Sequence, residues 1–240
     1  VNASLALDQA RAVKDIQEQE LMRKASHLND MAMAEIAHFF KEGVTETDLA
    51  EQLKKIYRDL GADGLSFEPL FAFGSNAASG HHWPDDTRLK PGDCILVDIG
   101  CTWEGYCSDM TRTFFYKNVT QHQQEVYHTV LKANEEAEKA VTPGIPLSSL
   151  DQIARGIITD KGYGSVFTHR LGHFIGLEDH EFGDVSSASA DRAVPGNIFS
   201  IEPGVYLEND MGVRVEDLVL VTDHGHEILN HFSKELTVID

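Results

Sequence analysis

Apolar residues recur at steps of three and four along the first part of the chain, which is the period of helices that bury one face. The first such run covers about 10–41, and its apolar positions are Leu21, Ala25, Leu28, Ala32, Ile36 and Phe39. Gly43 ends this predicted helix, because glycine readily adopts the left-handed conformation that closes a helix. Thr45 then caps a second predicted helix, which runs to about Leu60 and is closed by Gly61.

Shorter stretches with a two-residue alternation predict strands in the rest of the chain. We expect strands over 66–73, 93–101 and 106–115, and helices over 121–141 and 147–161. The region 166–221 is expected to consist of strands and loops, with the strongest alternation over 213–221. No Pro- or Ser-rich linker divides the sequence, so residues 1–240 are predicted to form a single domain.

A shift of 101 residues superposes similar positions in the two halves of the sequence. The superposed pairs are Gly43 and Gly144, Val44 and Ile145, Leu49 and Leu150, Ile56 and Ile157, Gly61 and Gly162, and Phe73 and Phe174. Chance is the alternative, since any two helix–turn–helix segments share Gly and Leu positions. If the repeat is real, the fold class is α+β, with two pseudo-symmetric halves whose helices cover a curved sheet of antiparallel strands. Ligands would then bind in the cleft between the halves.

Composition and charge exclude several classes of function. The apolar share of 42% and the charged share of 25% are ordinary for a soluble globular protein, and no apolar run approaches the roughly 20 residues of a membrane helix. The net charge of −19 argues against a nucleic-acid partner, which would need clustered Lys and Arg. The chain begins at Val1 without a secretory signal sequence. We therefore expect a cytoplasmic protein that is a fragment or a processed form of a longer one.

The cysteines Cys94, Cys101 and Cys107 lie close together on predicted strands. An odd number of cysteines in this setting indicates reduced, semi-buried thiols rather than a disulfide framework. A zinc site built from these thiols is disfavoured as well, because the sequence contains no pair of cysteines separated by two residues.

Two aspartates mark a predicted hairpin in the middle of the chain. Asp98 lies on a strand-like stretch, and Asp109 follows eleven positions later on the next one. If the turn centres on Trp103 and Glu104, the two carboxylates face each other across the hairpin, with Cβ atoms roughly 4.5–5.5 Å apart. Like charges placed so closely repel each other, and a bound cation would relieve the repulsion. The alternative is a pair of exposed aspartates near a turn.

Two glutamates repeat this arrangement near the end of the chain. Glu202 and Glu216 are each seven residues from Asn209, which lies in a predicted turn. His173 lies between the two carboxylate pairs in the sequence, and Gly172 before it disfavours a helix, so we expect it on a loop or strand. Hard oxygen ligands with a single imidazole suit two divalent cations that jointly activate water. The sequence therefore predicts a dinuclear metal site for hydrolysis.

These stretches resemble the pita-bread metallopeptidases, the family of Xaa-Pro aminopeptidases, Xaa-Pro dipeptidases (prolidases) and methionine aminopeptidases. The resemblance follows the family order from about residue 70 to 220, and it departs from the common pattern at Arg170, where glycine is frequent. The matching stretches are Gly74-Ser75-Asn76-Ala77-Ala78 with His81, Val97-Asp98-Ile99-Gly100, Gly105-Tyr106-Cys107-Ser108-Asp109-Met110-Thr111-Arg112-Thr113, His169-Arg170-Leu171-Gly172-His173 with Gly176-Leu177 and His180, Glu202-Pro203-Gly204-Val205-Tyr206, and Gly212-Val213-Arg214-Val215-Glu216-Asp217.

The resemblance implies a pita-bread fold and a role for each matching residue. Asp98 and Glu202 would each serve one metal, Asp109 and Glu216 would bridge both, and His173 would complete one coordination sphere. His81 and His180 would bind the substrate and take part in catalysis, and His169 would line the side that receives the leaving residue. Glu202 would move a proton, and Arg214 would hold Glu216 and a neighbour in place. The family commonly uses Mn, Co or Zn, and the oxygen-rich ligand set favours Mn(II).

The reaction expected from the resemblance is hydrolysis of an Xaa-Pro bond in a small peptide by a metal-bridging hydroxide. Arg214 and the residues after Glu202 look more like the proline peptidases, which usually carry a separate N-terminal domain that dimerises. This chain leaves no room for such a domain before its long helix, so it looks like an isolated catalytic half. The dimerising domain of the family implies that the full-length protein is a homodimer. Two alternatives stay open: an enzyme that releases N-terminal Met, and a non-catalytic peptide-binding module on the same fold.

Overall fold

The computed structural model describes residues 4–240, with side chains from Ala6 onward. The helices are α1 (Ser4–Arg11), α2 (Ile16–Ala37), α3 (Glu46–Leu60), α4 (Gln121–Ala140) and α5 (Leu147–Asp160), with 3-10 turns over Gly74–Ala78 and Gly164–Val166. The Thr45 hydroxyl accepts a hydrogen bond from the backbone N–H of Asp48 at the start of α3, and Gly61 closes that helix with a φ of +81°. Both ends of α3 are therefore where the sequence predicts them.

Strands from both halves form two larger sheets and two small ones within residues 4–240. The first larger sheet has the order β14–β6–β3–β2 and the second the order β13–β12–β9–β7–β8, with β1–β4–β5 and the β10–β11 hairpin as the small sheets. The strands are β1 (Gly64–Leu65), β2 (Leu70–Phe73), β3 (Cys94–Ile99), β4 (Cys101–Trp103), β5 (Tyr106–Cys107), β6 (Met110–Tyr116), β7 (Gly172–Phe174), β8 (Glu181–Val185), β9 (Ile198–Ile201), β10 (Gly204–Leu207), β11 (Met211–Arg214), β12 (Asp217–Val221), β13 (His226–Ile228) and β14 (Thr237–Ile239).

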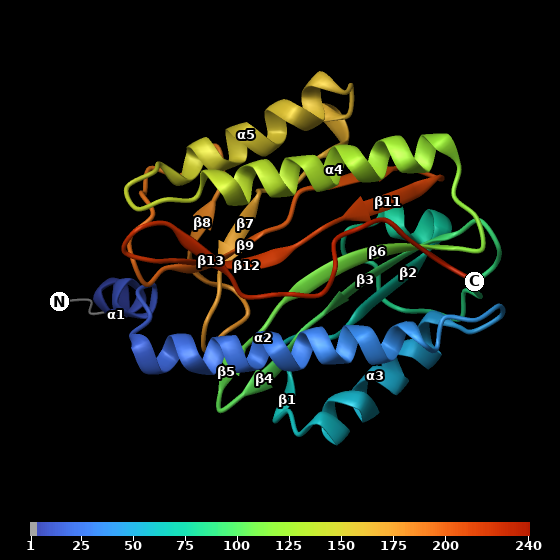
Figure 1. Ribbon diagram of the computed structural model, residues 1–240, viewed down its shortest axis with the longest axis horizontal. Helices are drawn as coiled ribbons and strands as arrows, with labels where there is room; N and C mark the ends of the chain where they lie inside the picture. Colours follow the sequence, from blue (N-terminus) through green and yellow to red (C-terminus); the bar gives the residue numbers. More distant parts are fainter. Residues whose placement is uncertain (1–3) are drawn as a thin grey trace.

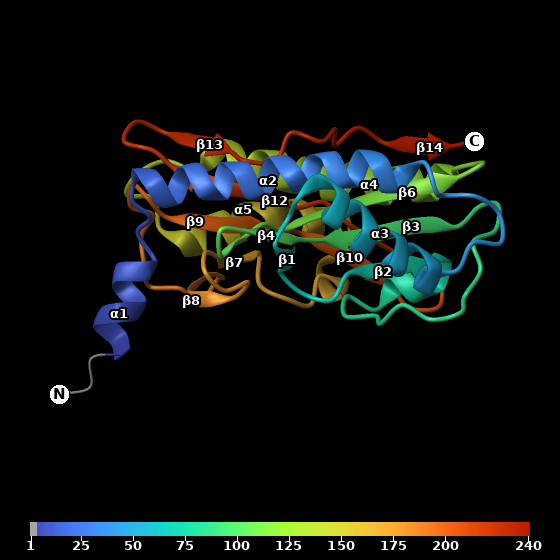
Figure 2. The same ribbon diagram turned by 90° about the horizontal axis from the view of Figure 1, so that it is seen from below.

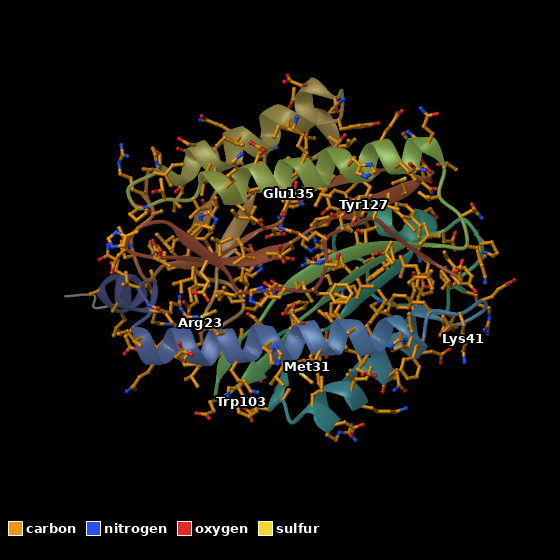
Figure 3. All side chains as sticks on the ribbon, in the orientation of Figure 1. Arg23, Met31, Lys41, Trp103, Tyr127 and Glu135 are labelled. Carbon is orange, nitrogen blue, oxygen red and sulfur yellow. The ribbon has the colours of Figure 1, made fainter. Side chains whose placement is uncertain are left out.

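The helices flank the strands in two pairs. Figure 1 shows α2 and α3 along one side of the strands and α4 and α5 along the other. Side chains of β3 alternate between the two pairs: Ile95 and Val97 join the apolar cluster of α2 and α3, whereas Leu96 joins the cluster of α4 and α5. Tyr127 of α4 packs edge-on against Phe115 of β6, with ring centroids 5.9 Å apart (Figure 3). Apolar burial on both sides thus fixes the sheet between the helices.

The internal repeat is present in the backbone of both halves. Gly43 donates a hydrogen bond to the Leu89 carbonyl, and Gly144 donates the equivalent bond to the Ala193 carbonyl. The two glycines share a left-handed conformation, with φ of +81° and +85°. The side chain of Asn134 donates to the Ile201 carbonyl, as another asparagine does to β3 in the first half. The predicted α+β fold with two pseudo-symmetric halves is confirmed.

The predicted boundaries of several elements are wrong. The helix expected over 10–41 is interrupted between α1 and α2, because the Lys14 N–H bonds the carbonyl of Gly196 and Asp15 caps the helix that follows. The α2 helix also ends at Ala37, before the predicted end. The strand expected over 66–73 is confined to its last four residues, and the alternating stretch 213–221 is divided between β11 and β12. The break between α1 and α2 thus involves a contact between segments that are distant in the sequence.

Helix α1 and the C-terminus lie at opposite ends of the molecule (Figure 2). Figure 2 shows α1 projecting from the body beside β8, whereas β14 and the C-terminus lie at the far end. Across residues 4–240, each helix is too short or too polar to cross a membrane. Cys94, Cys101 and Cys107 are buried free thiols, as the sequence predicts, and burial raises the pKa of Cys94 to about 12.

Candidate metal centre

The first aspartate pair lies beside the β3–β6 ladder in a register that differs from the predicted one, with Asp98 on β3 and Asp109 directly before β6. Asp98 is opposite Thr111, so Asp109 lies diagonally, two residues from that position. The hairpin that follows β3 turns at Glu104 and Gly105, which have φ of +47° and +86°. Two residues with positive φ form the tight turn that suits hairpins. Since side chains alternate along a strand, both aspartates still face the same side of the ladder.

The second carboxylate pair has the register that the sequence predicts. Gly204 pairs with Arg214 on one side of the glutamates, and Ile201 pairs with Asp217 on the other. Glu202 and Glu216 are therefore opposite each other, in the short gap between these two strand pairs. Asn209 has a φ of +59° at the turn, a conformation that asparagine tolerates better than most residues.

His173 lies on β7, and its ring points at both carboxylate pairs. Its Nε2 atom is 3.4 Å from Oδ2 of Asp109 and 3.6 Å from Oε1 of Glu202. Its Nδ1 atom lies 3.2 Å from the Phe174 carbonyl, an acceptor that favours a proton on Nδ1. The lone pair of Nε2 is then free to bind a metal.

All five predicted ligands line one cleft of about 360 Å³. The ligand atoms of Asp109, His173 and Glu216 lie within 4.8 Å of one another. In the part of the chain with described side chains, the Oδ1 atoms of Asp98 and Asp109 and the Oε1 atom of Glu216 are buried without a hydrogen-bond partner. Buried carboxylate oxygens are costly without a partner. Cations bound in the cleft would supply partners for all three, so the residues present fit bound divalent metal ions.

Electrostatics inside the cleft support the same interpretation. Burial raises the pKa of Asp109 well above its ordinary value, and the charges of Glu216 and Asp98 raise it further. Burial also raises the pKa of Glu202 to about 7. The pKa of His173 is lowered to about 3, first by burial and then by the neighbouring His180. The carboxylates of the cleft repel one another, and the imidazole beside them is neutral. Bound metal ions would offset this repulsion and use the neutral imidazole as a ligand.

Arg214 on β11 is buried beside the centre, but its carboxylate partner differs from the predicted one. Its Nη2 atom lies 2.6 Å from Oδ2 of Asp98, and its Nε–H donates to the hydroxyl of Thr111 at 3.0 Å. The Thr111 hydroxyl in turn donates to Oε2 of Glu216 at 2.6 Å. Arg214 therefore holds Asp98 directly and reaches Glu216 only through Thr111, because its guanidinium points across to β3 and β6.

The three predicted substrate histidines line the same cleft, at different depths. His81 and His180 are exposed to it, and the His180 ring lies 3.9 Å from that of His173. His169 lies deeper, and burial lowers its pKa to about 4. Its Nδ1 lies 2.7 Å from the Arg170 carbonyl and its Nε2 lies 2.9 Å from the Tyr206 hydroxyl. Because both ring nitrogens of His169 already have hydrogen-bond partners in the protein, the ring forms part of the cleft wall and offers no free donor to a ligand.

The loop that carries His81 is fixed by Glu46 at the start of α3. The Glu46 carboxylate accepts hydrogen bonds from the Phe73 N–H at 2.7 Å and from the Asp85 N–H at 3.1 Å, which bracket the loop. Its Oε2 also lies 2.6 Å from Nε2 of His82. His82 is thus turned away from the cleft that His81 lines, and its role is structural.

Sequence reasoning gave no role to three residues that the structure places at the centre. Asp179 lines the cleft with an unpartnered buried Oδ1, and burial, followed by the charge of Asp98, raises its pKa to about 7. Tyr206 receives a hydrogen bond from Arg214 at 2.9 Å. Thr111 joins Arg214 to a carboxylate. The alternation of strand side chains could have identified Thr111, since it lies two residues after Asp109.

The two-halved α+β fold with an acidic, histidine-containing cleft defines the pita-bread class of proteins. The chain matches the metallopeptidase family M24 over residues 20–223, and it belongs to that family. An uncharacterized peptidase of Staphylococcus aureus strain MW2 is 42% identical over 233 residues, which are 97% of this chain and 66% of the relative. The chain thus spans just under two thirds of the length of such curated relatives. The predicted family is confirmed.

Solved structures give the same result for the fold. A recombinant prolidase from Thermococcus sibiricus superposes with a TM-score of 0.97 at 36% identity, covering 99% of this chain and 65% of the prolidase. An X-Pro aminopeptidase from Thermotoga maritima superposes with a TM-score of 0.95 at 35% identity, covering 98% of this chain and 66% of the aminopeptidase. The predicted pita-bread fold is therefore confirmed.

Proposed function

We propose that this chain is a metallo-exopeptidase that uses two divalent metal ions to hydrolyse Xaa-Pro bonds in small peptides. The observation that carries the proposal is the convergence of His173 with two pairs of carboxylates whose buried oxygens have no protein partner. Proline specificity is supported by the similarity to a prolidase and to an X-Pro aminopeptidase.

Asp98, Asp109, His173, Glu202 and Glu216 would hold the two ions. Four carboxylates at −4 would balance two divalent cations at +4, which would make the buried centre formally neutral. The mostly oxygen ligand set favours Mn(II), with Co or Zn as the other candidates. When bound, the ions polarise a carbonyl oxygen and lower the pKa of water to near neutrality.

The chain's own residues supply proton transfer and orientation. Glu202 lines the cleft beside His173 and would exchange a proton with the leaving nitrogen. The Ser200 hydroxyl donates to Oε1 of Glu202 at 3.1 Å and fixes that carboxylate in the cleft. His81 and His180 would orient the peptide and donate to its carbonyl oxygen, and His169 would bound the side for the leaving residue. Arg214 would keep the Asp98 carboxylate directed at its metal.

The two alternatives are an aminopeptidase that releases N-terminal Met and a peptide-binding module without activity. One experiment separates all three: the purified chain is chelated, reloaded with Mn(II), and tested on Ala-Pro, Ala-Pro-Ala and Met-Ala-Ser. Metal-dependent release of the residue before proline supports the proposal, whereas release of Met favours the first alternative. Binding of fewer than two ions, without turnover, favours the module.

The variant Asp109→Asn tests the centre itself. Loss of one carboxylate charge between His173 and Glu216 would reduce metal binding and turnover together. Asp59→Asn, on the exposed end of α3, is the matched control and should behave as the wild type. Full metal-dependent turnover by Asp109→Asn would contradict the proposed centre.

The residues 1–240 would form one catalytic domain, since apolar clusters on both sides of β3 share that strand. The full-length protein would be a homodimer that works in the cytoplasm. Size measured by light scattering on the full-length protein tests the dimer.

A further inference from the structure

Two residues of opposite charge approach the two nitrogens of one imidazole in the cleft. The Nη2 atom of Arg170 lies 3.4 Å from Nδ1 of His180. An Oδ2 atom of Asp179 lies 3.5 Å from Nε2 of the same ring. The Arg170 guanidinium and the Asp179 carboxylate therefore contact opposite nitrogens of the His180 ring, and only this ring lies between them. Arg170 lies in the loop before β7, and Asp179 lies in the loop between β7 and β8.

Among the described side chains, neither group has an ion-pair partner other than the His180 ring. Within residues 6–240, the Arg170 guanidinium has no carboxylate within 4.0 Å, and its contact is with the His180 ring. Asp179 has one buried oxygen without a hydrogen-bond partner, and its ion-pair partner within the described side chains is again His180.

Both charged groups also lie beside the candidate metal centre. The His180 ring that separates them is stacked 3.9 Å from the ring of His173. Asp179 and Arg170 line the same cleft as the predicted metal ligands. The remaining acidic groups of that cleft would be balanced by the ions or, for Asp98, also by Arg214. Asp179 and Arg170 are thus the charges left for a ligand.

We propose that Arg170 and Asp179 are specificity-determining residues that bind the two charged ends of a short peptide, the guanidinium its terminal carboxylate and the aspartate its α-ammonium group. This inference rests on the proposed function and refines it, because it selects free dipeptides over longer or blocked peptides. A planar guanidinium can form two parallel hydrogen bonds with a carboxylate. An ammonium group would supply the hydrogen-bond donor that the buried Asp179 oxygen lacks.

The dimensions of the cleft agree with a ligand of this length. An extended dipeptide separates its charged ends by roughly 7 Å, which is comparable with the span across one imidazole and its two contacts. The cleft volume of about 360 Å³ is near the lower limit for pockets that bind small molecules. A longer peptide would have no charged end at one of the two positions, and the buried charge there would stay unpaired.

The experiment measures binding, so that it does not depend on turnover. The probe is an Ala-Pro analogue in which an alkene replaces the peptide bond, used as the free acid, the C-terminal amide and the N-acetyl derivative. Calorimetry on the Mn(II)-loaded chain compares the wild type with Arg170→Gln and Asp179→Asn. Arg58→Gln and Asp59→Asn are matched controls, because both residues are exposed at the outer end of α3. Thermal melts of each variant verify that it is folded.

We expect the wild type to bind the free acid at least about tenfold more tightly than the amide or the N-acetyl derivative, since hydrogen bonds between charged groups are strong. Arg170→Gln should lose the preference for the acid over the amide and keep the preference for the free amine. Asp179→Asn should show the reverse pattern, and both controls should match the wild type. Arg170→Lys, which keeps the charge, should retain part of the preference for the acid.

Two results would overturn the inference: a wild type that binds the acid and the amide equally or binds neither, or an Arg170→Gln variant with an unchanged preference. Hydrolysis of Ala-Pro and of Ala-Pro-Ala is followed in parallel. Selective binding without any hydrolysis would refute the proposed function and leave the recognition of the two ends standing. Equal hydrolysis of both peptides, without selective binding, would support the peptidase and refute the inference.

Discussion

The Nη2 atom of Arg214 lies 2.6 Å from Oδ2 of Asp98, and the same guanidinium donates to the hydroxyls of Thr111 and Tyr206. This arginine therefore fixes one candidate metal ligand directly and a second, Glu216, through Thr111. A lysine in its place would keep the positive charge but could not form these bonds simultaneously, because its ammonium group is a single point. Arg214→Lys consequently separates the effect of geometry from the effect of charge.

We expect Arg214→Lys to lower the affinity for Mn(II) by about 10–100-fold, as is usual when a residue that orients metal ligands is replaced. Calorimetric titration of the chelated chain measures this change. Arg23→Lys is the matched control, since Arg23 forms a partly exposed ion pair with Glu227 on the outer surface (Figure 3). Equal affinities for the wild type and Arg214→Lys would show that Arg214 does not orient the ligands.

Gly172 brings β7 against β9 beside the candidate ligand His173. A Cβ atom at position 172 would collide with the carbonyl of Ser200, which is backbone and cannot move aside. Gly172→Ala should therefore destabilise the fold by about 1–3 kcal/mol or more. Gly156→Ala in α5 is the control, because its Cβ would meet nothing within 4 Å. The control should gain about 0.5–1 kcal/mol from the helical preference of alanine.

Urea unfolding of both glycine variants gives the two free energies, and metal titration gives a second test. Since His173 follows Gly172 directly, a displaced β7 should also weaken the binding of Mn(II). Stability equal to that of the wild type in Gly172→Ala would mean that β7 and β9 can separate without cost. Such a result would contradict the close packing described here.

The facing positions of the second carboxylate pair could be predicted from the sequence, because the residue at the middle of its hairpin turn can be recognised there. The register of Glu202 and Glu216 follows from the position of Asn209, whose positive φ marks the middle of the hairpin. The register of Asp98 and Asp109 differs from the predicted one by two residues. The prediction centres the turn on Trp103 and Glu104, whereas the structure centres it on Glu104 and Gly105. The glycine was the available signal, since tight hairpin turns favour glycine at their second central position.

Other features depend on contacts that no local pattern contains. The interruption before α2 exists because the Asn197 side chain donates to the Ala12 carbonyl and the Lys14 N–H donates to the Gly196 carbonyl. These partners are nearly two hundred residues apart in the chain. Asp179 is comparable: its neighbour His180 marked it as close to the site, but its burial against the metal centre is a property of the folded loops.

The pH dependence of stability should carry a contribution from Glu138 on α4. Burial and the charge of Asp217 raise the pKa of Glu138 to about 8, although Lys234 lies 2.6 Å away and lowers it. A carboxyl group whose folded pKa exceeds its unfolded value stabilises the fold fully below the unfolded pKa of 4.5. That contribution is lost as the pH rises through about 8.

Glu138→Gln removes this titration, so the melting temperature of the variant should rise relative to that of the wild type between pH 5 and pH 9. Glu135→Gln on the exposed face of the same helix is the control and should follow the wild type at every pH (Figure 3). Differential scanning calorimetry measures both curves. A constant difference between Glu138→Gln and the wild type over this range would contradict the raised pKa.

The segment before α2 is joined to the loop of His180 by a buried ion pair. Lys14 Nζ lies 2.8 Å from Oε2 of Glu181, and the two side chains are 1% and 3% exposed. Arg11 donates to the other oxygen of Glu181 at 2.7 Å, which also accepts from the Leu177 N–H at 3.0 Å. Because Glu181 follows His180 directly, these bonds fix the loop that presents the histidine to the cleft.

Breaking this pair from one side should be costly, because it leaves a buried charge without its partner. We expect Glu181→Gln to destabilise the fold by about 3–5 kcal/mol. Lys14→Met should cost less than that, since Arg11 still pairs with the carboxylate. The double variant removes both charges. Its loss of stability should therefore be smaller than the sum of the losses in the two single variants. Urea unfolding of the four chains measures this coupling.

Hydrogen exchange shows whether the pair also orders the His180 loop. In Lys14→Met the Glu181 carboxylate loses one of its partners, and in Glu181→Gln an amide replaces it. The amide of Leu177, which donates to this side chain, should therefore exchange faster in both variants than in the wild type. The exposed pair of Lys54 and Glu51 on α3, 3.0 Å apart, is the control cycle and should show a coupling of about 0–1 kcal/mol. Additive losses with unchanged exchange at Leu177 would mean that the segment before α2 and the His180 loop fold independently.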